Sequence, residues 1–169
     1  MKERVTFKLN GRDVSIGLTR EKKLLEILRE DLGVTGTKCG CDSGVCGACA
    51  VVLDGKEVKS CLYSSEKLDG VEVLTIEGLS VNSIHPIQKA LIDAGAVQCG
   101  YCTPGIVMGL YALFHSNPGA EDAEIMKVLD RHLCRCTGYE ALVEGAKSAR
   151  VQFSEAGTRA PAADGGHIT

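Results

Sequence analysis

Hydrophobic and polar residues alternate along the first part of the chain. Apolar residues take every second position over residues 5–9 and again over residues 14–18. Asn10 and Gly11 stand between the two runs, and this dipeptide favours the positive φ angles of a two-residue hairpin turn. The pattern therefore predicts a β-hairpin near the N-terminus.

Three further apolar patterns follow in the first half of the chain. Leucine and isoleucine residues over residues 24–32 fit one face of a helix that ends near Gly33. Residues 50–60 predict a second hairpin that turns at an Asp-Gly pair, and residues 71–76 predict a last strand. We therefore expect a small mixed sheet with one helix packed on it.

The second half of the chain has helical spacing throughout. Pro86 suits the first turn of one helix, and Thr103 predicts an N-cap that is followed by proline at the first helical position. Thr137 and Glu140 match a capping box at the start of the last helix. With a further helix over residues 122–132, these signals predict a bundle of four short helices.

The predicted elements divide the chain into two domains and a tail. Residues 1–78 are expected to form the domain with the sheet, and residues 82–151 the all-α bundle. Residues 152–169 are small, polar and interrupted by Pro and Gly, which is typical of a tail. The expected fold class is α+β.

The composition and charge of the chain exclude some classes of function. The net charge is −3 and no basic stripe is present, so nucleic acid is not an expected partner. No run of about 18 apolar residues predicts a membrane span, and the N-terminus lacks the apolar core of a signal peptide, so a cytoplasmic location is expected. The nine cysteines then indicate metal binding or catalysis rather than a disulfide framework.

The glycine-rich segment at residues 36–61 holds the first group of cysteines. Cys41, Cys46 and Cys49 have C-x4-C-x2-C spacing and Cys61 follows at a distance, which is the plant-type spacing for a [2Fe–2S] cluster. Glycines among the thiols allow positive φ angles and let backbone N–H groups approach the sulfur atoms. We interpret the segment as a cluster-binding loop.

Other interpretations of this loop stay open. It could be a glycine-rich turn with incidental thiols, or a zinc site, although only Cys46 and Cys49 are spaced as a zinc knuckle. Cys39 is a fifth thiol in the segment. It is an alternative ligand, a spare buried thiol or a redox-active neighbour, and we interpret it as the spare thiol.

A second group of four cysteines lies in the helical half. Cys99 and Cys102 precede one predicted helix start, and Cys134 and Cys136 precede another. Free N–H groups and the helix dipole at such N-termini favour thiolate charge, so we expect one shared site buried in the bundle. Zinc is the rival ligand because Cys-x2-Cys is a common knuckle. Cys-x-Cys is unusual for zinc, and a second iron–sulfur site beside the first would complete an electron wire.

Histidines and tyrosines carry no comparable pattern. Tyr101 and Tyr139 are interpreted as core aromatic residues. The histidines have no ligand-like spacing and are interpreted as core, cap or surface residues: His85, His115, His132 and His167.

The cysteine motifs together resemble a known family. The matching stretches are residues 36–49, 60–62, 98–105 and 133–139, which include Gly-Cys-Asp-Ser-Gly-Val-Cys-Gly-Ala-Cys, Gln-Cys-Gly-Tyr-Cys-Thr-Pro-Gly and Leu-Cys-Arg-Cys-Thr-Gly-Tyr. They are similar to the small iron–sulfur subunit of molybdenum hydroxylases, the xanthine dehydrogenase, aldehyde oxidase and carbon monoxide dehydrogenase group. The resemblance extends over about residues 3–150.

The resemblance implies a β-grasp, plant-type ferredoxin-like domain followed by a four-helix domain, each with one [2Fe–2S] cluster. It also implies a pterin contact at Gln98, with Cys136 where the cluster approaches the pterin. The implied ligands are Cys99, Cys102, Cys134 and Cys136 for the proximal cluster and Cys41, Cys46, Cys49 and Cys61 for the distal one.

The function implied by the resemblance is that of an electron-transfer subunit. Electrons would pass from molybdopterin in a large subunit to FAD in a medium subunit, in a dimer of heterotrimers. The chain contains neither a molybdenum nor a flavin domain, so it is not expected to be catalytic alone. A stand-alone ferredoxin-like carrier and a structural zinc module are the alternatives.

Two limits follow from the resemblance. Cys39 stands where the family usually has a residue other than cysteine, and His132 stands where the family usually has Asn. The substrate pocket would lie on another chain, so nothing selects among purines, aldehydes, carbon monoxide, N-heterocycles and aromatic acyl-CoA thioesters.

Overall fold

An antiparallel hairpin begins the chain in the computed structural model, which describes residues 3–18, 21–80 and 83–155. Strand β1 (Arg4–Leu9) pairs with β2 (Arg12–Gly17). Asn10 and Gly11 have φ angles of 52° and 80°, the left-handed conformation that a type I′ turn requires at both positions. The predicted N-terminal hairpin is confirmed.

The described residues form a mixed sheet of five strands in the order β2-β1-β5-β3-β4. Strand β3 (Ala50–Leu53) is antiparallel to both β4 (Lys56–Lys59) and β5 (Glu72–Leu74), whereas β1 and β5 are parallel. The second predicted hairpin is thus confirmed. The last strand is shorter than predicted, because Ile76–Leu79 form the short helix α2.

One helical segment covers this sheet, as predicted. It consists of α1 (Leu24–Glu26), which continues directly into a π-helical turn, η1 (Ile27–Asp31). Its apolar side chains and those of the sheet form one buried cluster, which includes Val5, Phe7, Leu9, Leu24, Ile27, Leu28, Val51, Leu53, Leu68 and Val73.

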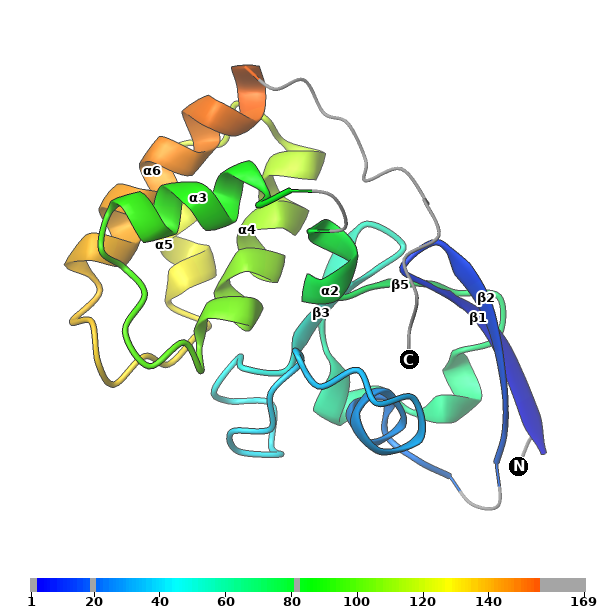
Figure 1. Ribbon diagram of the computed structural model, residues 1–169. Coiled ribbons are helices and arrows are strands. Elements are labelled where there is room, and N and C mark those ends of the chain that lie inside the picture. The colour runs from blue at the N-terminus through cyan, green and yellow to red at the C-terminus, as the bar shows by residue number, and fades with distance from the viewer. Residues whose placement is uncertain (1–2, 19–20, 81–82, 156–169) are drawn as a thin grey trace.

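The four predicted helices of the second half are present, and Figure 1 shows them grouped beside the sheet, away from the β1–β2 hairpin. They are α3 (Pro86–Asp93), α4 (Thr103–Ser116), α5 (Asp122–Leu129) and α6 (Glu140–Glu155). Helix α4 is buried along most of its length, and Val52 of β3 belongs to the core of the bundle. The helical half therefore packs directly on the sheet.

Two helix starts differ from the prediction. Helix α4 begins at Thr103, and Cys102 rather than Thr103 takes the N-cap position. Helix α6 begins at Glu140, three residues after the predicted start, because the Thr137 hydroxyl accepts a hydrogen bond from the Tyr139 N–H group within a preceding turn.

Two helix ends also differ. Helix α5 ends at Leu129, before the predicted end at residue 132. Helix α6 continues to Glu155, so the predicted tail does not begin at residue 152. The remainder of that tail, residues 156–169, lies outside the described residues, and the division at residues 78 and 82 stays a prediction.

No helix in the described part of the chain is both long enough and apolar enough to cross a membrane.

The contact between α3 and α6 depends on Leu91, which is fully buried and lies against Gly145. We expect Leu91→Ala to lower the free energy of unfolding by about 2–5 kcal/mol, because the truncated side chain leaves a cavity. Ile92→Ala is the matched control, since Ile92 is 53% exposed, and it should change that free energy by less than about 0.5 kcal/mol. Denaturant unfolding measures both. Equal losses would contradict this description of the bundle.

His85 is the N-cap of α3: its Nδ1 accepts the Ile87 N–H at 3.3 Å. Burial lowers the pKa of His85 below its ordinary value of 6.5. The unfolded chain binds the proton more readily between these two pKa values, so stability should be full above about pH 6.5 and decrease as the pH falls through that interval. His85→Asn retains a capping acceptor and should reduce this pH dependence, as thermal unfolding between about pH 5 and pH 8 would measure. An unchanged pH profile would contradict the assignment.

Candidate functional site

The β3–β4 hairpin brings two cysteines of the first group together. Cys49 immediately precedes β3, and Cys61 lies in the single helical turn η2 (Ser60–Leu62) that follows β4. Because β3 and β4 pair along their length, the chain returns to its starting point, and the Sγ atoms of Cys49 and Cys61 are 3.3 Å apart. Both thiols are buried and pack against Leu25 of α1. The prediction that this hairpin returns Cys61 to the loop is confirmed.

The other two thiols of the group lie in the loop between η1 and β3. The backbone N–H groups of Ser43 and Cys46 point at Cys41 Sγ, at 3.5 Å and 3.3 Å. Hydrogen bonds from Ser43, and then from Cys46, lower the pKa of Cys41 to about 6. This part of the loop therefore favours a thiolate.

Mutual repulsion acts on the more buried thiols of the same group. Burial raises the pKa of Cys46, and the neighbouring Cys41 and Cys49 raise it further. Burial and then Cys49 raise the pKa of Cys61 to about 12. The four thiols thus lie within electrostatic range of one another, so positive charge placed among them would relieve their repulsion.

The backbone of this loop fits a group held close to it. A Cβ atom on Gly40 would lie 2.8 Å from Cys46 Sγ, so only glycine fits beside that thiol. Gly47 has a φ angle of +76°, which other residues rarely adopt. Thiols that converge on a tight loop with N–H groups directed at sulfur are what a [2Fe–2S] cluster requires.

The second group of cysteines converges from two parts of the helical half. The Sγ atoms of Cys99 and Cys136 are 3.6 Å apart. Burial, followed by the hydrogen bond and charge of Cys134, raises the pKa of Cys102 to about 12. The Thr137 hydroxyl donates to Cys134 Sγ at 3.2 Å. The structure therefore brings together the two pairs that the sequence assigned to one site.

The second site does not lie inside the bundle, contrary to the prediction. Cys99 and Cys136 are exposed, and of the four thiols only Cys102 is buried. Cys102 lies at a helix N-terminus, whereas Cys136 is separated from α6 by a turn. Tyr139 forms this turn at a φ angle of 71°; its hydroxyl donates to the His132 carbonyl at 2.9 Å and accepts the Cys134 N–H at 2.8 Å.

Two hydrogen bonds join the cysteine loops to each other. The Leu133 N–H donates to the Cys46 carbonyl at 2.8 Å, and Leu133 directly precedes Cys134. The Tyr101 hydroxyl, from within the second cysteine motif, donates to the Cys39 carbonyl at 2.6 Å. The two sites are therefore neighbours whose loops are hydrogen-bonded to each other. The sequence did not predict these two hydrogen bonds.

Two single residues differ from their interpretation, whereas Tyr139 and His132 agree with theirs. Cys39 is exposed, so it is not a buried thiol, and Tyr101 is 48% exposed, so it is not a core aromatic residue. Gln98 is exposed next to Cys99. Tyr139 is partly buried against the core of the bundle, and His132 is fully buried.

The ligand assignments remain predictions. Within the described ranges, no group of three or more His, Cys, Asp or Glu side chains meets the geometry of a site for one metal ion. The thiols instead meet as close pairs within two sets of four.

Comparison with known proteins gives two adjoining matches. Residues 7–75 match the protein family described as a 2Fe-2S iron-sulfur cluster binding domain, and residues 75–147 match that described as a [2Fe-2S] binding domain. The nicotine 6-hydroxylase small subunit of Paenarthrobacter nicotinovorans is 39% identical over 88% of this chain and 90% of its own length. The nicotinate dehydrogenase small FeS subunit of Eubacterium barkeri is 42% identical over 80% of this chain and 87% of its own.

Solved structures show the same fold. The crystal structure of the aldehyde oxidoreductase from Desulfovibrio desulfuricans superposes with a TM-score of 0.86 at 34% sequence identity, over 91% of this chain. The matched region is only 17% of that longer chain. The β-grasp ferredoxin-like domain and the helical domain after it are thus confirmed as the fold.

Substitution of single cysteines separates Cys39 from the predicted ligands. Cys39→Ser should keep both paramagnetic signals of the reduced protein, because this thiol is exposed and Tyr101 contacts only its carbonyl. Cys46→Ser, the same change in the same loop, should remove one signal. Low-temperature electron paramagnetic resonance (EPR) measures both variants. Loss of a signal in Cys39→Ser would make Cys39 a ligand.

Proposed function

The chain belongs to the family of small [2Fe–2S] iron–sulfur subunits of molybdenum hydroxylases, and we propose that it is the electron-transfer subunit of a heteromeric enzyme of this kind. Members of the family are iron–sulfur subunits of oxidoreductases. Partnership with larger subunits follows from its relatives, which are small subunits or parts of longer chains.

Eight cysteines would hold the two clusters in this proposal. When bound, each cluster supplies one-electron storage, through which electrons from a molybdopterin site in a large subunit reach FAD in a medium subunit. The proximal set is Cys99, Cys102, Cys134 and Cys136, and the distal set is Cys41, Cys46, Cys49 and Cys61.

The observation that carries the proposal is the hydrogen bond from the Leu133 N–H to the Cys46 carbonyl. Leu133 directly precedes Cys134 in the chain. A path from Cys46 to Cys134 therefore consists of covalent bonds and one hydrogen bond of 2.8 Å. A short, nearly continuous path of bonds between two sites suits electron transfer between them. A structural zinc module, or a carrier with one site, would not need such a path.

Each of the two cysteine sites has an exposed thiol, which supports contact between each site and a partner subunit. Gln98, Cys99 and Cys136 are exposed around the second site, and we place them toward the pterin of the large subunit. Cys41 is exposed at the first site, and we place it toward the flavin subunit. A dimer of heterotrimers in the cytoplasm is the assembly we propose, and the substrate would be bound by the large subunit.

Purification from the native host tests the proposed function. We expect the affinity-tagged chain to co-purify with a molybdopterin-binding subunit and a FAD-binding subunit. The visible absorption of the iron–sulfur clusters should bleach when a substrate of the complex is added.

Two outcomes would contradict the proposal. A chain that carries electrons as a monomer, with no larger subunits, would be a stand-alone carrier. A colourless, zinc-loaded chain with no charge-transfer bands in the visible region would be a structural zinc module.

A further inference from the structure

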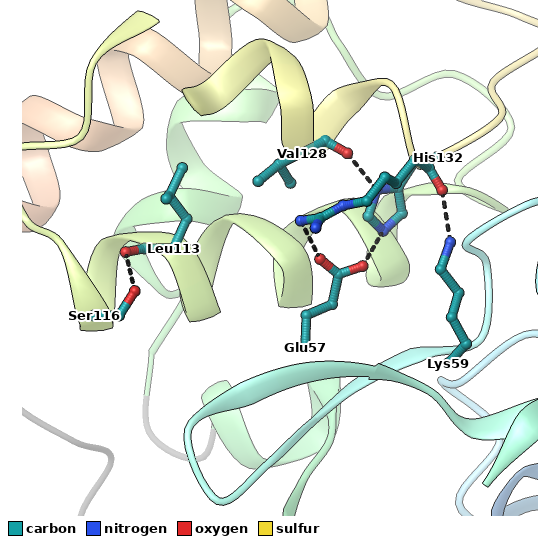
Figure 2. A network of polar contacts seen from close by, with 7 residues as sticks. Glu57, Lys59, Leu113, Ser116, Val128 and His132 are labelled. Atoms are coloured by element: carbon teal, nitrogen blue, oxygen red, sulfur yellow. Dashed lines mark hydrogen bonds and ion pairs between the residues drawn. The ribbon is translucent and has the colours of Figure 1, made fainter. Parts of the chain in front are cut away.

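His132 lies where the two halves of the molecule meet, and its side chain is 1% exposed. Its Nδ1 lies 2.9 Å from the Val128 carbonyl oxygen. Because a carbonyl only accepts, Nδ1 is assigned the proton. The other ring nitrogen, Nε2, is buried, has no hydrogen-bond partner among the residues that the structure describes, and lies 3.7 Å from Glu57 Oε1 (Figure 2). The ring is thus held by helix α5 and by packing, not by the carboxylate.

The imidazole fills a space that two glycines leave open. A Cβ atom on Gly47, in the first cysteine loop, would lie 2.6 Å from His132 Cδ2. A Cβ atom on Gly109, in α4, would lie 2.9 Å from His132 Cε1. The ring therefore touches the loop of the first site and the central helix of the bundle at the same time, and a side chain at either glycine would clash with it.

The residues on both sides of His132 are fastened to the first half of the molecule. Lys59 Nζ donates to the Arg131 carbonyl at 2.8 Å, and Arg131 Nη2 lies 2.6 Å from Glu57 Oε2. Leu133 makes the hydrogen bond to Cys46. We call residues 131–133 the strap, and Figure 2 shows its polar contacts with Glu57 and Lys59 of β4.

We propose that His132 is a positioning residue, which sets the Leu133–Cys46 hydrogen bond and thereby the coupling between the two cluster sites. The part of this inference that concerns clusters rests on the proposed function. Without the ring, the strap borders a void between Gly47 and Gly109, and only backbone and polar contacts hold it: those of Arg131 with β4, that of the His132 carbonyl with Tyr139, and the Leu133–Cys46 hydrogen bond itself. The position of Leu133 relative to Cys46 is then less closely fixed, because no packed side chain supports the strap behind it.

The purified complex with His132→Ala tests the proposal. Both clusters should be retained, and the magnetic interaction between the two reduced clusters, measured by low-temperature EPR, should weaken. Electron transfer between the sites should slow by on the order of tenfold, as is usual when a group that orients a metal site is removed. Hydrogen exchange of the Leu133 amide, measured by mass spectrometry, should become faster.

Two further variants separate positioning from general loss of structure. His115→Ala is the matched control, because His115 is an exposed histidine of α4 that stacks on Tyr111, and it should change none of the three measurements. Lys59→Met removes one contact of the strap without opening the core, so it should change all three in the same direction but less. It keeps the proposal testable if His132→Ala does not fold.

The outcomes distinguish this inference from the proposed function. His132→Ala could retain two clusters with an unchanged magnetic interaction and unchanged exchange of the Leu133 amide. This result would overturn the role of His132 and leave the proposed function intact. If only Lys59→Met folds, the same result in that variant has the same meaning. A wild-type complex without two clusters would overturn both.

Discussion

The packing of α4 against β3 is the constraint on which the two-site arrangement depends. Gly105 of α4 lies against the backbone of Gly47 and Ala48, immediately before β3, and Val52 of β3 is part of the core of the bundle. This close approach brings the first cysteine loop to the start of α4, where Cys102 is the N-cap residue. This packing holds the two cysteine loops close enough for the Leu133 N–H to reach the Cys46 carbonyl.

The electrostatics of the thiols fit this arrangement. The buried thiols of Cys61 and Cys102 have pKa values raised to about 12, first by burial and then by neighbouring thiols. Such groups resist ionisation until a cation is bound, whereas N–H groups already favour the thiolate of Cys41. Each set therefore combines buried thiols with an exposed edge, at Cys41 in one and at Cys99 and Cys136 in the other. In the proposed function, these exposed edges face the partner subunits.

Local signals account for the parts of the fold that the sequence predicted. Asn10-Gly11 fixes a hairpin because both residues readily take the positive φ angles of its turn. The C-x4-C-x2-C spacing likewise predicts a cluster-binding loop, because the ligands lie close together in the chain. The exposure of the second site was not predictable, because it depends on the turn before α6. Gly138 marks a turn there, but nothing in the sequence shows that Tyr139 also takes a positive φ angle. The position of His132 likewise depends on the space left by Gly47 and Gly109, which are distant from it in the chain and carry no shared motif with it.

The central claim is that two separate four-cysteine sets each hold one [2Fe–2S] cluster. A crystal structure of the metal-loaded complex, with anomalous difference maps recorded on both sides of the iron absorption edge, tests it most directly. We expect one pair of iron atoms among Cys41, Cys46, Cys49 and Cys61 and a second pair among Cys99, Cys102, Cys134 and Cys136. A single metal peak in either set, an anomalous signal from zinc, or iron bound by Cys39 in place of Cys41 would contradict it.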